Sequence, residues 1–261
     1  MLLVFNVGNH VLSLGFVENG EVTARASLSS DKARTADEYA LSLHSLLALH
    51  RLHKEDFEGA IGSSVVPSLT ETVCDAISLV FSLRPHLLGG GIRTGLSIRT
   101  EFPAELGSDL VAAAVGALTR FAPPLLLVDF GTAITLSAVS AEKEFLGCAI
   151  LPGLSLSSAS LSEATALLPD VRLKAPLHAI GKTTTESLQS GRVFGTAAMV
   201  DGMVARMAKE MGVAPTVVLT GHSAQTVMPH LSTQAVYAED LLFLGLEEIY
   251  QKNERKKSSR S

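Results

Sequence analysis

The chain carries one short pattern twice, and this duplication limits the folds that it can adopt. The first copy, VFNVGNHVLSL, runs from Val4 to Leu14, and the second, LVDFGTAITLS, runs from Leu127 to Ser137. In each copy an apolar run is followed by a polar residue, a large apolar residue, a glycine, another polar residue and a second apolar run. This order is typical of two strands joined by a tight turn. Two such units predict two similar lobes.

The elements that follow each copy repeat in the same order. Apolar periodicity and turn residues in the first half predict a hairpin turn at 18–21, a third strand at 22–28, a helix that ends near residue 53, a strand at 60–66 and helical segments at 69–81 and from Leu110. The second half predicts a turn at 141–144, a third strand at 145–151, helices at 154–167 and 185–211, a strand at 216–219 and a closing helix at 238–251. We therefore expect an α/β fold with two duplicated lobes.

The predicted domain boundaries follow from this repeat. The first lobe covers residues 1–120, the second covers 121–251, and 252–261 form a basic polar tail, which is typical of a solvated chain end. The boundary lies near 120–124. Because clefts between domains are preferred places for ligands, we expect the site in an interlobe cleft.

Composition excludes several classes of protein. Of the 261 residues, 47% are hydrophobic and 18% are charged, which predicts a large core and excludes a disordered chain. The net charge of −5 gives no sign of a nucleic-acid partner. The apolar run before Asp129 is far too short to span a membrane, and no basic segment precedes the first strand as in a signal peptide. Two isolated cysteines, Cys74 and Cys148, favour a cytoplasmic location.

The two glycine turns predict phosphate binding. Glycine permits a positive φ and lets the backbone approach a ligand closely, so amides at Gly8 and Gly131 can converge on an anion. Asn9 and Thr132 add side-chain donors, and Asp129 can hold Mg²⁺ directly or through water. A pair of ordinary hairpins with buried turns is the alternative, and the matched duplication favours the phosphate interpretation.

A second glycine position suits a nucleotide. The segment VVLTGHSA, residues 217–224, predicts a strand that ends in a small-residue turn at Gly221, and AIGSSVVP, residues 60–67, is its counterpart in the first half. Strand ends at a domain cleft suit a purine and its ribose.

Seven segments give the chain a resemblance to a known family. They are RTADEYA (34–40), SSVVP (63–67), TGLSIR (94–99), DFGTAIT (129–135), LPGLSLS (151–157), GKTTTESLQSG (181–191) and VVLTG (217–221). The double turn resembles the superfamily of acetate and sugar kinases, heat-shock chaperones and actin, which is built from two ribonuclease-H-like lobes. Within it the chain is similar to type III pantothenate kinases along nearly its whole length.

The resemblance implies a reaction, its cofactors and its site. ATP would phosphorylate pantothenate to 4′-phosphopantothenate for coenzyme A biosynthesis, with Mg²⁺ and a monovalent cation (K⁺ or NH₄⁺) as cofactors and a homodimer as the assembly. Asp109 would be the catalytic base and Asp129 the metal ligand. The implied ATP-binding residues are Asn6, Gly8, Asn9, His10, Gly131, Thr132 and Gly221. The implied substrate-binding residues are Thr100, Gly107 and Thr184, of which Thr184 would reach the pantothenate of the neighbouring subunit.

Two of these residues also have a purely structural interpretation. Ser108 or Asp109 precedes the apolar run LVAAAVGAL and can be a helix N-cap. Thr184 precedes Glu186 and can be the N-cap of another helix.

The chain departs from the family at five positions in the predicted site. Asn6 replaces an aspartate, His10 a threonine, Thr100 a tyrosine, Leu110 an arginine and His222 a glycine. Asn6 keeps an oxygen but lacks the charge that attracts Mg²⁺, and Leu110 cannot pair with an anion. Two hypotheses follow: a working kinase with altered metal and substrate contacts, or a catalytically impaired paralogue that acts as a binding or regulatory accessory protein.

Overall fold

The computed structural model describes residues 1–258, with side chains as far as Glu254. The chain forms two compact units. The first contains Met1–Leu96, Glu101–Arg120 and the chain from Asp240 onward, and the second contains Ser97–Thr100 and Phe121–Glu239. The expected cleft between the lobes stays a prediction.

The first unit is built on a five-stranded sheet with the order β3-β2-β1-β4-β5. Its strands are β1 (Leu2–Val7), β2 (Val11–Glu18), β3 (Glu21–Ser29), β4 (Gly59–Ser64) and β5 (His86–Leu87). Asn19 and Gly20, with φ of 54° and 84°, form the β2–β3 turn that the Asn-Gly pair predicts. Strand β1 lies between β2, which is antiparallel to it, and β4, which is parallel.

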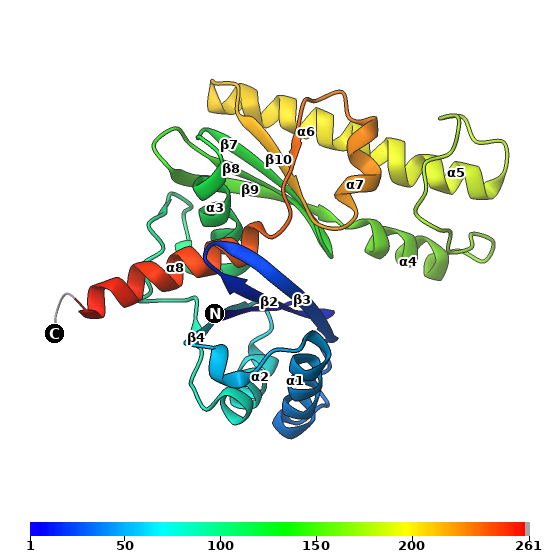
Figure 1. Ribbon diagram of the computed structural model, residues 1–261. Helices are drawn as coiled ribbons and strands as arrows, with labels where there is room; N and C mark the ends of the chain where they lie inside the picture. The colour runs from blue at the N-terminus through cyan, green and yellow to red at the C-terminus, as the bar shows by residue number, and fades with distance from the viewer. Residues whose placement is uncertain (259–261) are drawn as a thin grey trace. The chain divides into compact units, whose positions relative to one another are not determined.

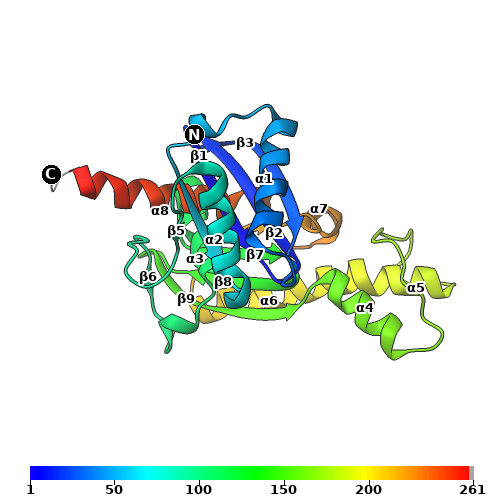
Figure 2. The same cartoon turned by 90° about the horizontal axis from the view of Figure 1, so that it is seen from below.

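Helices α1 (Ala36–His50) and α2 (Pro67–Phe81) pack on one face of this sheet (Figure 2). Thr35 and Glu38 form a capping box that starts α1, so the polar segment before the helix fixes where it begins. Alternate residues of β1, namely Leu3, Phe5 and Val7, join the core beneath the helices. Two short 3₁₀ turns, η1 (Lys54–Asp56) and η2 (Pro103–Glu105), complete the connections.

The second unit repeats this order as β11-β10-β7-β8-β9 and adds β6 at the far edge. Its strands are β6 (Ser97–Ile98), β7 (Leu125–Phe130), β8 (Ala133–Val139), β9 (Glu144–Pro152), β10 (Thr216–Thr220) and β11 (Val236–Tyr237). The pairing directions match as well, because β7 is antiparallel to β8 and parallel to β10. The predicted duplication of an α/β unit is therefore confirmed.

Helices of the second unit cover its sheet and continue into an arm (Figure 1). They are α4 (Leu154–Ala164), α5 (Thr184–Ser190), the π-helical segment η3 (Gly191–Gly195), α6 (Thr196–Met211), α7 (Ala224–Val227) and the 3₁₀ turn η4 (Met228–His230). Val200 and Val204 of α6 are buried against the strands. The name arm is used below for residues 154–190, which run through α4 and α5. The single helix expected at 185–211 is thus interrupted by η3.

The last helix lies in the first unit, whereas the expected second lobe extended to residue 251. Helix α8 (Leu241–Ser258) packs on α3 (Ser108–Arg120) so closely that the two backbones are in contact. A Cβ atom on Gly116 would lie 1.8 Å from the Leu241 carbonyl oxygen, and one on Gly245 would lie 1.8 Å from that of Ala112. Two glycines inside helices therefore explain the pairing. Residues 252–258 of the expected tail continue α8, and 259–261 lie outside the described residues.

Within the described part of the chain, no helix combines the length and the apolar character that crossing a membrane requires.

Candidate active site

Asp129 occupies the end of β7, the central strand of the second unit. In the sheet it is paired with Thr135 of β8 and Thr220 of β10. Both of its carboxylate oxygens lie 4.0 Å from the position of a Cβ atom on Gly131. The carboxylate thus lies beside the exposed turn that joins β7 to β8, as the sequence predicts for a metal ligand.

Gly131 is not required by the protein around it. Its φ lies outside the positive range, so the expected use of a left-handed conformation is wrong here. A Cβ atom at this position would lie 3.5 Å from the nearest atom, the Ala133 carbonyl oxygen, which is an ordinary contact. Gly131 and Thr132 are both exposed. The glycine therefore leaves open space above the turn, where a ligand can approach the backbone.

Gly221, at the end of β10, is required by its neighbours. Its φ is +88°, and a Cβ atom would lie 2.8 Å from both Asp129 Oδ1 and the carbonyl oxygen of Phe130. Only glycine fits this conformation and this distance. The end of β10 therefore packs directly against Asp129, and the exposed His222 follows it.

Gly153 supports the same turn from the other side. Its amide donates to the Thr132 carbonyl oxygen at 3.0 Å. A Cβ atom on Gly153 would lie 2.3 Å from that oxygen and 2.4 Å from the Gly131 carbonyl oxygen. Helix α4 begins at the next residue, Leu154, so the start of this helix and the Gly131–Thr132 turn are fixed together.

The corresponding turn in the first unit carries no charge at its strand end. Asn6 ends β1, and its amide oxygen accepts a hydrogen bond from the Ser63 hydroxyl at 2.8 Å. Gly8 closes the turn by donating to the Val11 carbonyl oxygen at 3.0 Å. A Cβ atom on Gly8 would lie 2.9 Å from this same oxygen, so packing, and not a positive φ, requires glycine. Asn9 and His10 are exposed at the tip.

Asp109 lies in the first turn of α3, which is anchored to β4. The Ser108 hydroxyl bonds both the amide and the carbonyl oxygen of Ser64 at 3.2 Å. The neighbouring Ser63 bonds Asn6, so the hydrogen bonds connect the end of β1 with the start of α3. The helix begins at Ser108, so the residue that precedes it is Gly107 and not Ser108 or Asp109, although the Asp109 carboxylate accepts a hydrogen bond from the Leu110 amide within the first turn.

The environment of Asp109 suits a proton acceptor. Burial raises the pKa of the Asp109 carboxyl above its ordinary value, and the hydrogen bond from the Leu110 amide opposes that shift in part. Its Oδ1 atom lies 2.9 Å from this amide nitrogen. A Cβ atom on Gly107 would lie 2.5 Å from Oδ1, so the glycine provides the space that the carboxylate occupies. A raised pKa makes the ionised form a stronger base.

The other two predicted substrate residues lie in the second unit. Thr100 follows β6, which pairs with the start of β9, and its hydroxyl is buried with no hydrogen-bond partner in the described protein. Such a group has a cost unless a ligand or water satisfies it. Thr184 is exposed at the start of α5. Its neighbour Thr183 is the N-cap and accepts from the Glu186 amide, so the N-cap interpretation of Thr184 is wrong.

The predicted residues thus form separate groups. Asn6, Gly8, Gly107 and Asp109 are joined by the contacts of the first unit, and Asp129, Gly131, Thr132 and Gly221 by those of the second. Thr184 lies apart, on α5 in the arm (Figure 1). The sequence interpretation gave no role to Ser63 and Gly153, although both occur in the segments that carry the resemblance. Ser63 falls in a predicted strand and Gly153 directly precedes a predicted helix, but neither position indicates which distant residue it contacts.

Asp129 alone suits a metal ion whose other ligands come from a bound nucleotide and water. Among the residues that the structure describes, no three His, Cys, Asp or Glu side chains are grouped as a metal site. Mg²⁺ in nucleotide sites usually takes one or two protein carboxylates and completes its shell with phosphate oxygens and water. A single carboxylate at Asp129, beside an open turn, fits this arrangement.

Comparisons with known proteins identify the family. A family model described as type III pantothenate kinase matches residues 2–206. A type III pantothenate kinase from Dictyoglomus turgidum is 38% identical over 257 residues, covering 97% of this chain and 100% of the relative. That of Exiguobacterium sibiricum is 37% identical over 253 residues, with the same coverage of both chains.

Two solved structures share the fold at low sequence identity. A conserved protein of Campylobacter jejuni, assigned to the Baf family of transcriptional activators, has a TM-score of 0.61 at 20% identity and covers 97% of this chain and 99% of its own. A Sinorhizobium meliloti protein assigned as a 2-dehydro-3-deoxygalactonokinase has a TM-score of 0.61 at 12% identity with the same coverage. These show the duplicated ribonuclease-H-like fold alone. Together with the near full-length sequence matches, the duplicated sheets and their strand-end turns show that the chain belongs to the type III pantothenate kinase family.

Proposed function

We propose that this protein is an active kinase that transfers the γ-phosphoryl group of ATP to the 4′-hydroxyl of pantothenate, for coenzyme A biosynthesis. One observation carries the proposal beyond family membership. The Asp129 carboxylate lies beside a turn whose glycine is required neither by its φ nor by neighbouring atoms, while Gly221 packs against the same carboxylate. Such a turn suits a phosphate ligand.

The two turns divide the binding of the phosphates. Gly131 and Thr132 offer backbone amides and one hydroxyl in the second unit. In the first unit Asn9 and His10 offer donors at the exposed tip, while Gly8, whose amide already donates to Val11, keeps the turn tight. Asp129 would hold Mg²⁺ together with the nucleotide. A bound Mg²⁺ neutralises charge on the β- and γ-phosphates. Positioning and charge neutralisation supply most of the acceleration in such reactions.

Asp109 acts as the base. The acceptor hydroxyl oxygen forms a bond to the γ-phosphorus as the bond from that phosphorus to the β–γ bridging oxygen breaks, and ADP leaves. The hydroxyl proton passes to the Asp109 carboxylate and then to solvent. Because burial raises the pKa of Asp109, the ionised carboxylate holds a proton better than an exposed aspartate does.

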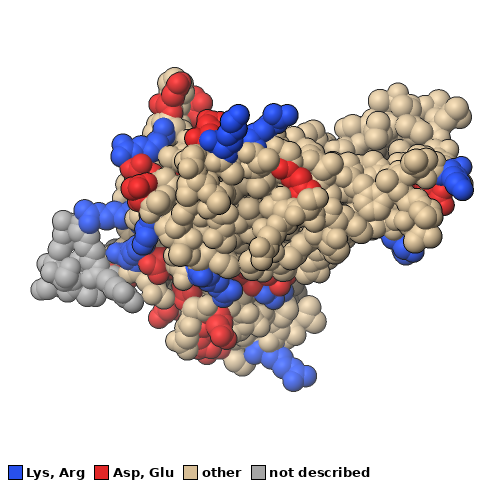
Figure 3. Space-filling model, turned by 90° about the horizontal axis from the view of Figure 1, so that it is seen from above, with Lys and Arg blue, Asp and Glu red and all other residues tan. Residues whose placement is uncertain are grey.

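The acceptor side uses Thr100, Gly107 and Thr184. The unsatisfied Thr100 hydroxyl is available to hydrogen-bond a polar ligand, and Gly107 leaves room for the base. Thr184 acts in the site of a second subunit of a homodimer. The arm that carries Thr184 has exposed apolar side chains, which are Leu156, Leu161, Leu167, Leu177 and Ile180. At the right of Figure 3 the arm shows mostly uncharged surface, which suits burial in an interface.

The remaining parts of the proposal are a monovalent cation, K⁺ or NH₄⁺, as an activator, and a cytoplasmic location. Within the described residues neither Cys74 nor Cys148 is in a disulfide, which suits a reducing compartment. The cation is tested by comparing turnover in K⁺, NH₄⁺ and Na⁺ salts at one ionic strength.

A coupled assay of ADP release, at high ATP with and without pantothenate, tests the reaction. The proposal expects release that requires pantothenate and Mg²⁺. Mass spectrometry should find 4′-phosphopantothenate in an amount equal to the ADP. Pantothenate-independent release, or none at all, would contradict the proposed activity. Sedimentation at micromolar concentration tests the homodimer, and a monomer would contradict it.

A further inference from the structure

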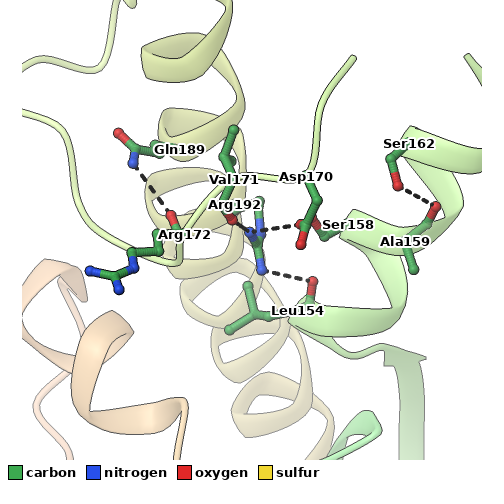
Figure 4. Close-up of polar contacts among 9 residues, drawn as sticks. All are labelled: Leu154, Ser158, Ala159, Ser162, Asp170, Val171, Arg172, Gln189 and Arg192. Atoms are coloured by element: carbon green, nitrogen blue, oxygen red, sulfur yellow. Dashed lines mark hydrogen bonds and ion pairs between the residues drawn. The ribbon is translucent and has the colours of Figure 1, made fainter. Parts of the chain in front are cut away.

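Arg192 is a buried cation that the proposed reaction does not use. It lies in η3, and only 10% of its side chain is exposed. Its guanidinium group donates to the Val171 carbonyl oxygen and, at 3.4 Å, to that of Leu154. It also forms an ion pair with Asp170 at 3.9 Å (Figure 4). A buried arginine needs such partners because leaving its charge unpaired is costly.

These contacts join three segments that are far apart in the sequence. Leu154 is the first residue of α4, and Asp170 and Val171 belong to the loop that returns from α4 toward α5. Asp170 also accepts a hydrogen bond from Ser158 of α4 at 2.6 Å (Figure 4). The negative charge of Asp170 offsets the positive charge of Arg192 near the N-terminus of α4, which is the positive end of the dipole of that helix. Arg192 thus fixes the start of α4 and the return loop to one point on η3.

The residue before α4 contacts the Gly131–Thr132 turn directly. Gly153, one residue before Leu154, donates its amide to the Thr132 carbonyl oxygen at 3.0 Å and packs against Gly131. A displacement of Leu154 therefore moves the turn that would bind phosphate. The path from Arg192 to this turn consists of one hydrogen bond, one peptide unit and a second hydrogen bond.

The return loop leads to Thr184. Next to Arg192, Ser190 donates to the Ala179 carbonyl oxygen at 2.5 Å, and Gln189 donates to that of Arg172 at 3.3 Å. These contacts hold residues 171–179 against α5, whose first residue is Thr184. The segment around Arg192 therefore orients both the Gly131–Thr132 turn and the part of the arm that carries Thr184.

We propose that Arg192 is a positioning residue of this enzyme, which holds the Gly131–Thr132 turn and the 165–183 loop in the geometry that both substrates require. The inference rests on the proposed function. One arginine suits this task because its planar group donates in several fixed directions at once, whereas lysine is a single point charge.

The first test compares Arg192→Lys and Arg192→Met with Arg172→Met, which removes an exposed arginine from the same loop. We expect KM for ATP to rise roughly tenfold in Arg192→Lys, and KM for pantothenate to rise as well, with a smaller change in kcat. Arg192→Met should be worse and Arg172→Met unchanged. Equal KM values in Arg192→Lys and wild type would overturn the proposal.

A double-mutant cycle separates positioning from general stability. Thr132→Ala removes a hydroxyl that the proposal places on a phosphate, and its effect should shrink in the Arg192→Lys protein because the turn is already displaced. Asn9→Ala, in the other turn, should add independently. Full additivity of Arg192→Lys with Thr132→Ala would count against the path through Gly153.

Hydrogen exchange on the free protein provides a readout that needs no turnover. In Arg192→Lys we expect faster exchange at the Gly153 amide and in 165–183, with β1 and β2 unchanged. Uniform acceleration throughout the chain would mean that Arg192 has only a stabilising role. If the wild type neither binds ATP with Mg²⁺ nor releases ADP, the proposed function fails, and the exchange result still decides whether Arg192 holds the turn.

Discussion

The turn after β1 and the turn after β7 have the same position in the same order of strands, but their strand ends differ in charge and in packing. Asn6 lies between Ser13 and Ser63 in its sheet, and Asp129 lies between Thr135 and Thr220. Small hydroxyl side chains thus flank both positions. The duplication preserved the environment of the strand-end residue while its charge diverged.

The glycines of the two turns also have different tasks. A Cβ atom on Gly8 would lie 2.9 Å from the Val11 carbonyl oxygen, whereas one on Gly131 would meet nothing closer than 3.5 Å. The first glycine is therefore required by the fold, and the second leaves room for a ligand. In the proposed function the two units would therefore have different roles. The first unit would supply the base, and the second would supply the charged contact to the nucleotide.

The largest effect is expected at Asp109, the proposed base, which lies in the first unit. Asp109→Asn keeps the acceptor for the Leu110 amide but cannot take a proton, so kcat should fall by about 10²–10⁴. In the wild type, kcat should decline as the pH falls through the raised pKa of Asp109. Steady-state kinetics across pH measure both. An active Asp109→Asn protein would contradict the proposal that the first unit supplies the base.

The same substitution should stabilise the folded protein at neutral pH. Burial raises the folded-state pKa of Asp109, so folding favours the protonated form, and the ionised carboxylate destabilises the folded state at pH 7. Asparagine removes this penalty. The gain over wild type in the denaturation midpoint should shrink as the pH falls through the folded-state pKa, because the wild-type carboxyl then becomes neutral. A gain independent of pH would point to another cause.

The second effect in size concerns Asp129. Asp129→Asn gives the second turn the residue type of the first and removes a charged contact to Mg²⁺. The affinity for ATP in Mg²⁺ should fall roughly ten- to a hundredfold, with little change when Mg²⁺ is absent. Calorimetric titration measures both, and Glu142→Gln, which removes an exposed charge from the β8–β9 turn, is the control. An equal loss without Mg²⁺ would show that Asp129 acts on the fold and not on the metal.

The third effect in size is a contrast between Gly8 and Gly131, the glycines of the two turns. Gly8→Ala should lower the free energy of unfolding by about 1–2 kcal/mol, because the turn must shift to admit a Cβ atom. Gly131→Ala should leave stability within about 0.5 kcal/mol but weaken ATP binding by blocking approach to the backbone. Chemical denaturation and calorimetry on both variants measure the contrast. Equal losses of stability would contradict it.

The sequence predicted the parts of the fold that depend on local pattern. Apolar runs interrupted by turn residues, including the Asn19-Gly20 pair, identified the strands of the first unit, and the repeat identified those of the second. Long-range backbone contacts were not predictable in this way. Gly116 and Gly245 bring α3 and α8 together, but a glycine in a helical pattern does not reveal which distant carbonyl oxygen it approaches. For this reason the last helix was expected in the wrong unit.

The site shows the same limit. Asp129 was predicted from its place directly before a glycine turn, and Asp109 from the resemblance to the family. The hydrogen bonds from Ser63 to Asn6 and from Gly153 to Thr132 join residues separated by other elements, so no local signal marked them. A positive φ was considered for Gly8 and Gly131 but occurs at Gly221, because a turn can tighten through packing without a left-handed residue.

The smallest expected effect is a gain, from Asn6→Asp. The Ser63 hydroxyl that now donates to Asn6 can donate equally to an aspartate, so the fold should accept the change. A carboxylate there would add an anion for Mg²⁺ and strengthen ATP binding severalfold, up to about tenfold. Without Mg²⁺ the half-buried charge should leave stability unchanged or slightly lower, because desolvation opposes ionisation.

Titrations of wild type and Asn6→Asp with ATP, with and without Mg²⁺, measure how much metal-dependent affinity a carboxylate at the first turn adds. Turnover should rise less than binding, because Thr100, Leu110 and His222 still differ from the family pattern. Asn9→Asp, which places a new charge at the exposed tip, is the matched control. If both substitutions improve binding equally, general attraction of Mg²⁺ explains the gain. If neither does, position 6 does not contact the metal, and the charge of the second turn alone suffices for the nucleotide.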